Sequence, residues 1–522
     1  MDLERGARFL ALLGACVGCG SGLSSGSNAR LADSGGSNDG SSGGGSSSYH
    51  GVAPPPPGSI CDLAAQPVDV SHPTTVVGTG TPASCTEQAL ASAVAAGGIV
   101  TFDCGPAPVT IAVTSEVPVS RDTTIDGGQL VTLSGGGSSR ILHITSAWNV
   151  ATPLLTVQNL AFIDGMTTDV PNTTSTLAGG AAIFEDGGSL TVISCTFANN
   201  QCASSGQDVS GGAINGQGVG TLIVEGSTFT GNSGSNGGAI GTQDESVTVV
   251  NSVFVGNRAT GTGGNPGNGG DGGAMSFDGA TVSWTMCGDT FSQNYAGAQG
   301  GAVFRVAYND EPVTIDRCVF DDNSVDPSAG NAGGLYLEYA TIAMTATTIS
   351  RNSAHFGGGI WIGHNAVAAL ANDTIADNTA SMGGGVWLAG GITGTLLNVT
   401  IAGNAGNGIA GGDTGVTLQN TLLADNTMGS YEGEVSCDHS HSGAGSNMEY
   451  PGDPNSPCTS SVIVSDPELG PLQDNGGVTQ TMLPAAGSPA IGQGSGCPPT
   501  DQRGQTRNNP CTLGAVEALG YP

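Results

Sequence analysis

Residues 211–240 read GGAINGQGVGTLIVEGSTFTGNSGSNGGAI. The stretch begins and ends with a glycine pair followed by Ala and Ile, and between the pairs Phe229 stands three residues before Asn232. Leu222 and Val224 are two residues apart, as expected for side chains on one face of a β-strand. The step of five from Val224 to Phe229 changes face, so a bend must separate two strands. The stretch therefore predicts a unit of short strands joined by bends.

The same signatures recur along the chain, which identifies a repeat protein. A repeat unit of this size cannot bury its own apolar face, so neighbouring units must stack to form a continuous core. The glycine pairs begin at Gly179, Gly211, Gly237, Gly272, Gly300, Gly333, Gly358 and Gly384.

We therefore predict an all-β fold, a single-stranded right-handed parallel β-helix of the pectate-lyase type with roughly a dozen coils. Stacking places equivalent residues about 4.8 Å apart, so a column of asparagines should form a ladder of amide hydrogen bonds. In this interpretation the glycines and asparagines are architectural and do not form a binding site. The ladder residues are Asn200, Asn232, Asn257, Asn294, Asn323, Asn352, Asn378, Asn404 and Asn426.

The regions on either side of the repeats predict two caps. Ser84 and Glu87 form a capping-box pattern before an alanine-rich stretch that ends at Ala96, which favours a short N-terminal capping helix. We assign residues 59–120 to this cap and the first strands, 121–430 to the β-helix, and 431–522 to an irregular C-terminal cap. The Pro/Gly-rich C-terminal region suits a cover for the exposed edge of the last coil.

The N-terminus predicts export. Two arginines precede a short apolar run, and Leu13-Gly14-Ala15-Cys16 resembles a bacterial lipobox, in which the cysteine carries the lipid. We expect a lipoprotein signal peptide over residues 1–15, lipid on Cys16 with Cys19 as the alternative acceptor, and a disordered Ser/Gly/Pro linker over residues 16–58. The predicted location is the bacterial cell envelope, at the outer membrane or the cell surface. An ordinary signal peptide with incidental cysteines is the competing interpretation.

Charge and cysteine content narrow the function classes. The net charge of −32, with 43 acidic and 11 basic residues, disfavours nucleic-acid binding because the surface repels phosphate. The 13 cysteines favour an oxidising compartment. Neighbours in sequence suggest four disulfides, although sequence alone does not fix the pairing. The candidate pairs are Cys85 with Cys104, Cys195 with Cys202, Cys437 with Cys458, and Cys497 with Cys511.

Two families resemble parts of the chain. The combined Gly-Gly-Ala-Ile and Phe-x-x-Asn repeats over residues 179–426 resemble the passenger region of polymorphic outer membrane proteins, which implies a surface adhesin on a β-helix; the C-terminal membrane barrel of that family has no counterpart here. Near the C-terminus, Asp466-Pro467-Glu468-Leu469-Gly470, Thr500-Asp501-Gln502-Arg503-Gly504 and Gly514-Ala515-Val516-Glu517 resemble the choice-of-anchor Q module, which implies a bacterial surface protein.

The variable segments between each asparagine and the next glycine pair should leave one corner of the coil, which makes that face a candidate surface for binding glycans or proteins. Neutral length variation is the competing explanation. We expect a non-enzymatic, adhesin-like or structural protein without a metal or cofactor. The alternative is a polysaccharide lyase or glycoside hydrolase on the same fold. Asp321, Asp322 and His364 faintly resemble polygalacturonase elements, but Asp322 precedes a ladder asparagine and is better interpreted as a bend residue.

Overall fold

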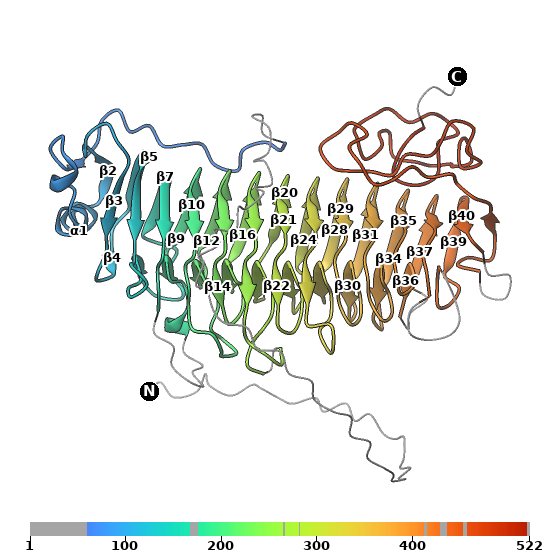
Figure 1. Ribbon diagram of the computed structural model, residues 1–522, viewed down its shortest axis with the longest axis horizontal. Helices are drawn as coiled ribbons and strands as arrows, with labels where there is room; N and C mark the ends of the chain where they lie inside the picture. The colour runs from blue at the N-terminus through green and yellow to red at the C-terminus, as the bar shows by residue number, and fades with distance from the viewer. Residues whose placement is uncertain are drawn as a thin grey trace, which may run out of the picture. The chain divides into compact units, whose positions relative to one another are not determined.

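The computed structural model describes residues 60–167, 176–264, 267–280, 282–411, 415–428, 436–452 and 457–518. Over these ranges the chain is an all-β parallel solenoid of about 13 turns with one short α-helix, which confirms the predicted fold class (Figure 1). The expected signal peptide, the lipid-bearing cysteines and the linker lie outside the described residues.

One long sheet, sheet B, runs along the solenoid and follows the glycine pairs. All its strands pair in parallel with the equivalent strand of the next coil. Its members are β4 (Val117–Val119), β6 (Leu142–Thr145), β8 (Ile183–Asp186), β11 (Ile214–Gln217), β15 (Ile240–Gln243), β19 (Met275–Asp278), β23 (Val303–Val306), β27 (Leu335–Glu338), β30 (Ile360–Gly363), β33 (Val386–Leu388) and β36 (Ile409–Ala410).

The second long sheet, sheet A, has two flanks separated by a bend. Its N-terminal strands are β1 (Thr75–Val77), β2 (Gly98–Phe102), β3 (Val109–Ala112), β5 (Thr123–Ser134) and β7 (Leu154–Ile163), and the long strands β5 and β7 reach across both flanks. Flank A1 then contains β9 (Ser189–Ile193), β12 (Thr221–Glu225), β16 (Ser246–Val250), β20 (Trp284–Cys287), β24 (Pro312–Asp316), β28 (Thr341–Thr345), β31 (Val367–Ala371), β34 (Thr393–Leu397), β37 (Val416–Gln419) and β39 (Ser442–Ala444).

Flank A2 carries the Phe/Ile column, and a small sheet C follows it in four coils. Sheet C consists of β14 (Ser233–Gly234), β18 (Arg258–Ala259), β22 (Tyr295–Ala296) and β26 (Ser324–Val325). Flank A2 contains β10 (Thr196–Ala198), β13 (Thr228–Thr230), β17 (Val253–Val255), β21 (Thr290–Ser292), β25 (Val319–Asp321), β29 (Thr348–Ser350), β32 (Thr374–Ala376), β35 (Thr400–Ala402), β38 (Leu422–Ala424), β40 (Asn447–Tyr450) and β41 (Val462–Val464).

The glycine pairs shape the bend that precedes sheet B. Gly211 has a φ of 71°, a left-handed conformation that most side chains avoid. The second glycine allows two coils to approach closely, because a Cβ on Gly212 would lie 2.1 Å from the carbonyl oxygen of Gly238. Ala332 takes the left-handed position in a later coil, with a φ of 63°. Bend geometry and close packing of neighbouring coils thus explain the repeated glycines.

Two stacks fill and fasten the interior. Each ladder asparagine from Asn200 to Asn404 donates its Nδ2 hydrogen to the Oδ1 atom of the next, at 2.9–3.0 Å, and Asn426 ends the series. The same Nδ2 groups also donate to carbonyl oxygens of the Phe/Ile column, as Asn294 does to Phe254. Six phenylalanines stack with ring centroids 4.7–4.9 Å apart: Phe162, Phe197, Phe229, Phe254, Phe291 and Phe320.

The capping helix is present, but its N-cap differs from the prediction. Helix α1 spans Glu87–Ala96, and the side chain of Thr86 accepts the N-terminal hydrogen bond from the backbone of Ala89. Ser84 instead ends a 3-10 turn, Pro82–Ser84, and its hydroxyl accepts from the backbone of Thr79. A second 3-10 turn spans Thr176–Ala178.

Disulfides form at three of the four expected pairs, and a fourth was not foreseen. Cys85 pairs with Cys104, Cys437 with Cys458, and Cys497 with Cys511, while Cys61 pairs with Cys287 across 226 residues. The expected pairing of Cys195 with Cys202 is wrong: neither residue forms a disulfide, and both side chains are buried, as is that of Cys318. Several disulfides in one chain are typical of proteins outside the cytoplasm.

Residues 60–71, the strap, run along one edge of the solenoid against the direction of stacking (Figure 1). The backbone of Cys61 exchanges hydrogen bonds with the side chain of Asn251 at 3.0 and 3.1 Å, and Ala64 donates to Glu225 at 2.9 Å. Further on, Val68 donates to the side chain of Gln158 at 2.9 Å. The strap therefore binds the bend between flanks A1 and A2 in successive coils, held at its start by the Cys61–Cys287 disulfide.

Residues 466–518, the C-terminal module, cover the same edge of later coils (Figure 1). This position differs from the expected one, a cap over the end of the last coil. The solenoid itself continues through β41, beyond the expected boundary at residue 430. The module then turns back onto flank A2. Its Ala515 donates a backbone hydrogen bond to the hydroxyl of Thr400 at 2.9 Å, and Thr374 donates to the side chain of Gln502 at 2.6 Å.

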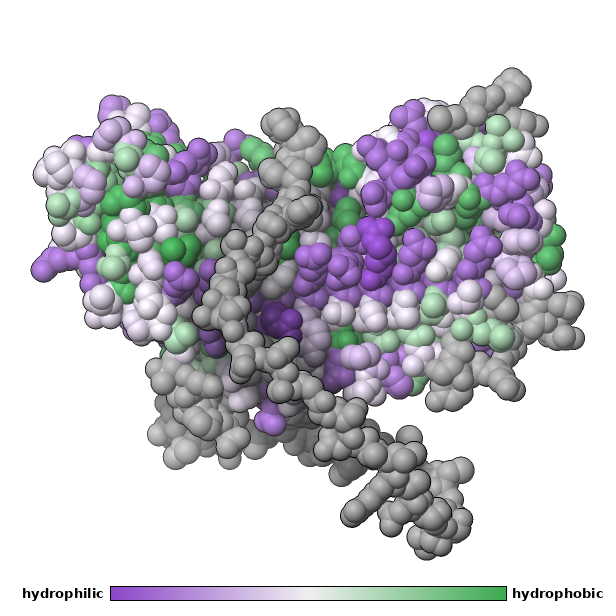
Figure 2. Space-filling view, viewed as in Figure 1, coloured by the Kyte–Doolittle hydropathy of each residue, from purple (hydrophilic) through white to green (hydrophobic). Residues whose placement is uncertain are grey.

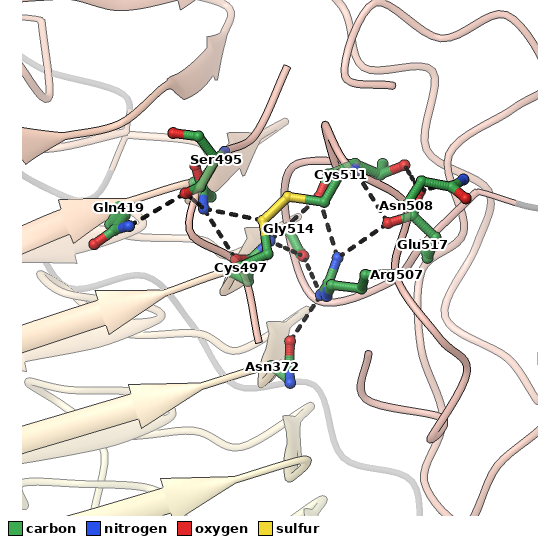
Figure 3. Close-up of a disulfide and its surroundings, with 12 residues drawn as sticks. Asn372, Gln419, Ser495, Cys497, Arg507, Asn508, Cys511, Gly514 and Glu517 are labelled. Atoms are coloured by element: carbon green, nitrogen blue, oxygen red, sulfur yellow. Dashed lines mark hydrogen bonds and ion pairs between the residues drawn. A yellow bond between two sulfur atoms is a disulfide. The ribbon is translucent and has the colours of Figure 1, made fainter. Parts of the chain in front are cut away.

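A buried polar network fastens the module (Figure 3). Arg507 donates to Asn372 Oδ1 at 2.7 Å and to the carbonyl oxygen of Gly514 at 2.9 Å, next to the Cys497–Cys511 disulfide. Its guanidinium lies 3.6 Å from Glu517, and burial lowers the Arg507 pKa to about 10. The sequence motifs that resemble an anchor module are thus part of the contact between the module and the solenoid.

Candidate functional site

The outward face of sheet B carries a column of aromatic side chains in the later coils. Side chains alternate along each strand, so the first and third residues point into the core and the second and fourth point outward. The strand register aligns the second residues in one column, which begins with Phe184, continues with three small or polar residues and is aromatic from Phe304 onward. This column consists of Phe184, Asn215, Gly241, Ser276, Phe304, Tyr336, Trp361 and Trp387.

We call Phe304, Tyr336, Trp361 and Trp387 the aromatic strip. Successive ring centroids are 5.1, 5.7 and 5.3 Å apart and the rings are nearly parallel. Phe304 and Tyr336 are buried, whereas the two tryptophans are partly exposed. The ring faces stack on one another, and Trp361 Nε1 is a buried N–H group without a hydrogen-bond partner.

Polar groups run beside the strip at the ends of the same strands. Glu338 Oε1 accepts a hydrogen bond from the hydroxyl of Tyr336 at 2.7 Å and lies 2.8 Å from Nδ1 of His364. Tyr308, an exposed residue of the preceding coil, donates its hydroxyl hydrogen to Oδ1 of Asp278, one coil earlier still, at 2.6 Å. Burial and the neighbouring carboxylates raise the pKa values of Tyr308 and Tyr336, so both phenols stay protonated and act as donors. An apolar strip with flanking hydrogen-bonding groups is typical of ligand-binding surfaces.

An acidic pocket adjoins Phe304 at the N-terminal end of the strip. Asp208, Asp271 and Asp278 line it together with several amide and hydroxyl groups. Asp271 is only 1% exposed, and neither carboxylate oxygen has a hydrogen-bond partner. Burial, with the charge of Asp278, raises the Asp271 pKa to about 8, and the same causes raise the pKa of Asp208. The enclosed space of about 20 Å³ suits roughly one water molecule.

Two variable loops meet beside this pocket. Gly206 donates a backbone hydrogen bond to the carbonyl oxygen of Asn268, and the hydroxyl of Ser235 donates to the carbonyl oxygen of Gly206 at 2.7 Å. Residues 203–209 are therefore fastened to the described residues 267–270 of the longest loop between repeats. Gln207 and Asp208 of the first loop line the pocket, as does Asp271, which directly follows the second.

The residues that faintly resembled a polygalacturonase site do not assemble. Asp321 is on β25 in flank A2 and forms an ion pair with Arg351 at 2.8 Å. Asp322 follows it with a φ of 56°, which makes it a bend residue. His364 follows β30 in sheet B, where it contacts Glu338. The hydrolase constellation suggested by these three residues is thus divided between two sheets.

A larger cavity of about 210 Å³ lies between the strap and the first coils. Val70, Phe102, Val109 and Val131 are among its lining residues, and Figure 2 shows hydrophobic surface gathered over these N-terminal coils. Its one carboxylate, Asp126, accepts hydrogen bonds from two neighbouring amide side chains and one backbone amide. The carboxylate is engaged in holding the coils together, so this cavity is a weaker candidate than the face of sheet B.

Two groups of side chains in the described ranges come close enough to share a metal ion. In one of them Cys61 and Cys287 form a disulfide with each other, which leaves no thiolate ligand beside Asp316. The other consists of Asp438, His439 and His441, for which the sequence had suggested no role.

Comparisons with known proteins show a similarity in fold. The model of the right handed beta helix region matches residues 301–450. No curated protein matches the sequence. Among solved structures, PfbA, a surface adhesin of Streptococcus pneumoniae, is similar at 12% identity over 61% of this chain and 89% of its own, with a TM-score of 0.31.

Two alginate-modifying proteins are similar at the same level. A PL6 alginate lyase in complex with a trisaccharide shares 13% identity over 76% of this chain and 88% of its own, with a TM-score of 0.40. The A-module of the mannuronan C-5 epimerase AlgE6 of Azotobacter vinelandii shares 14% identity over 73% of this chain and 95% of its own, with a TM-score of 0.35. The strand pairing itself shows the fold.

Proposed function

We propose that this protein is a non-enzymatic, adhesin-like β-helix protein of the bacterial cell envelope that binds a polysaccharide along the outward face of sheet B. The aromatic strip is the observation that carries the proposal. It extends over four successive coils about 4.8 Å apart and presents partly exposed tryptophans in the last two, so it suits an extended chain of repeating apolar and hydroxylated units better than a compact small molecule. Glu338 and His364 beside it can hydrogen-bond hydroxyl groups.

The negative charge of the protein indicates which class of polysaccharide it can bind. Asp278 and Glu338 flank the strip, and the whole chain has a net charge of −32, so an acidic polymer would be repelled. We therefore propose a neutral or amino-sugar polymer as the ligand. In a binding assay, dextran, galactomannan and chitosan oligomers would be compared with alginate and polygalacturonate at low and high salt.

Substitution of the two tryptophans tests whether the aromatic strip binds the polysaccharide. Replacing Trp361 and Trp387 with alanine should weaken binding to the preferred polymer at least about tenfold, because each partly exposed ring contributes apolar contact area. Trp148, which is 41% exposed and lies elsewhere, provides the matched control. Equal loss of affinity in a Trp148→Ala variant, or unchanged affinity in the double variant, would refute the assignment of the strip.

The export and anchoring proposals rest on the N-terminal sequence. We propose that lipid on Cys16, with Cys19 as the alternative acceptor, holds the protein at the outer membrane and that residues 16–58 form the linker. In the part of the chain that the structure describes, no helix is long and apolar enough to cross a membrane. Labelled fatty acid should be incorporated by the wild type and lost when both cysteines are replaced.

One observation favours the enzymatic alternative. Asp271, with a pKa raised to about 8, lies near Asp278, and a carboxylic acid that stays protonated at neutral pH can act as the general acid of a glycoside hydrolase. However, Asp271 is 1% exposed in a space of water size, so a sugar ring has no access to it. Release of reducing ends from any of the polymers above, abolished by Asp271→Asn, would establish the hydrolase instead.

A further inference from the structure

The last rung of sheet B brings together three side chains of metal-binding type. Cys437 pairs with Ile409 in parallel, so the next residue, Asp438, stands beside Ala410 in the outward column that includes Trp387. His439 and His441 follow, separated only by Ser440.

The ligand atoms of these residues converge. One oxygen or nitrogen from each of Asp438, His439 and His441 lies within 4.8 Å of the others. Asp438 Oδ1 is 2.7 Å from His439 Nδ1, and the two imidazole centroids are 4.5 Å apart. Ligands at about 2.0–2.1 Å from a common ion are separated by up to roughly 4 Å, so small side-chain rotations suffice to reach one ion.

The surroundings hold the three residues in place. The Cys437–Cys458 disulfide precedes the group, and the backbone of His441 donates to the carbonyl oxygen of Cys458 at 2.8 Å. The other carboxylate oxygen of Asp438 accepts from the backbone of Gly411 at 2.8 Å. His441 is 4% exposed, whereas the side chains of Asp438 and His439 are 25% and 28% exposed, which gives an ion access from solvent.

We propose that Asp438, His439 and His441 bind one divalent transition-metal ion of the zinc class. Two imidazoles and a carboxylate suit zinc and its neighbours, and disfavour calcium, which takes six or more oxygen ligands. Three protein ligands leave one tetrahedral position for water or a ligand at the C-terminal end of the outward face of sheet B. The metal site does not depend on whether the aromatic strip binds a glycan.

The experiment uses the full exported chain with its disulfides formed, without a histidine tag and treated with EDTA. Titration with zinc chloride should show one ion per chain, and zinc should raise the melting temperature because it binds the folded state. Asp438→Asn and His439→Gln should each weaken zinc binding at least about tenfold. Both positions are partly exposed, so these variants avoid the packing loss expected on replacing His441.

His355→Gln and His364→Gln serve as matched controls, and both should bind zinc as the wild type does. Histidine NMR signals add a direct readout, since only those of His439 and His441 should shift with stoichiometric zinc. Absence of stoichiometric binding, equal affinity in the Asp438→Asn and His439→Gln variants, or loss of binding in a control variant would overturn the proposal. Competition by calcium at similar concentrations would also overturn it.

Discussion

Gly216 leaves room inside the solenoid for the carboxyl group of Glu245: a Cβ on Gly216 would lie 1.9 Å from Glu245 Oε2. Glu185 occupies the coil before Gly216 in the same inward column, and both glutamates are completely buried. Burial raises the pKa of Glu245 to about 8, and burial with the adjacent carboxyl group raises that of Glu185. A glycine in a core column thus accommodates a pair of protonated acids.

This pair predicts that stability falls as the medium becomes alkaline. The folded-state pKa of Glu245 lies above the ordinary value of 4.5, so its stabilising contribution is complete below about pH 4.5 and is lost as pH rises through about 8. We expect the melting temperature to decline between pH 5 and 9, and Glu245→Gln to reduce that slope. The pKa of Asp271 is likewise raised to about 8, so the Glu245→Gln variant should keep part of the decline of melting temperature with pH.

Calorimetry across this pH range tests the prediction, with Glu468→Gln as a control at an exposed site. A variant slope equal to that of the wild type would show that Glu245 is already ionised in the folded protein.

A single ladder residue should matter more than its size suggests. Asn294 accepts hydrogen bonds from the backbone and side chain of Asn257 and donates to Phe254 and Asn323. Asn294→Ala leaves these buried groups without partners, so we expect a loss of about 3 kcal/mol in the free energy of unfolding. Chemical denaturation measures the loss, and Asn309→Ala, in an exposed turn, should cost far less.

The ladder and strand register could be predicted because each coil repeats the same chemistry at the same spacing. The aromatic strip also had a sequence signal, since Tyr336, Trp361 and Trp387 each follow the first apolar residue after a glycine pair. The acidic pocket had none, because Asp208 and Asp271 come from loops of different coils. Contacts outside the repeat, such as Cys61 with Cys287, depend on how the chain ends fold back over the solenoid.

Removal of the Cys61–Cys287 disulfide should loosen the strap from the solenoid. Replacing Cys61 and Cys287 with serine removes a link between residues far apart in sequence, and such disulfides typically contribute roughly 2–5 kcal/mol. The hydrogen bonds of the strap to Asn251, Glu225 and Gln158 remain. We expect faster hydrogen exchange over residues 60–71 and at the bends beneath them, with unchanged exchange at the C-terminal module. Uniform protection in the variant would show that the side-chain contacts alone hold the strap.

Arg507 should determine whether the C-terminal module stays on the solenoid. Its guanidinium links Asn372 of the solenoid to the carbonyl oxygens of Gly514 and Ala515, and Glu517 lies beside it (Figure 3). Arg507→Ala leaves Glu517 buried without this partner, which typically costs about 3–5 kcal/mol. Because the coils beneath are joined by their own ladders, we expect protease to cleave within residues 466–518 while the β-sheet circular dichroism persists. Arg121→Ala, at an exposed arginine, should resist the protease as the wild type does. Cooperative loss of the whole solenoid in the Arg507 variant would instead show that the module and the coils fold as one unit.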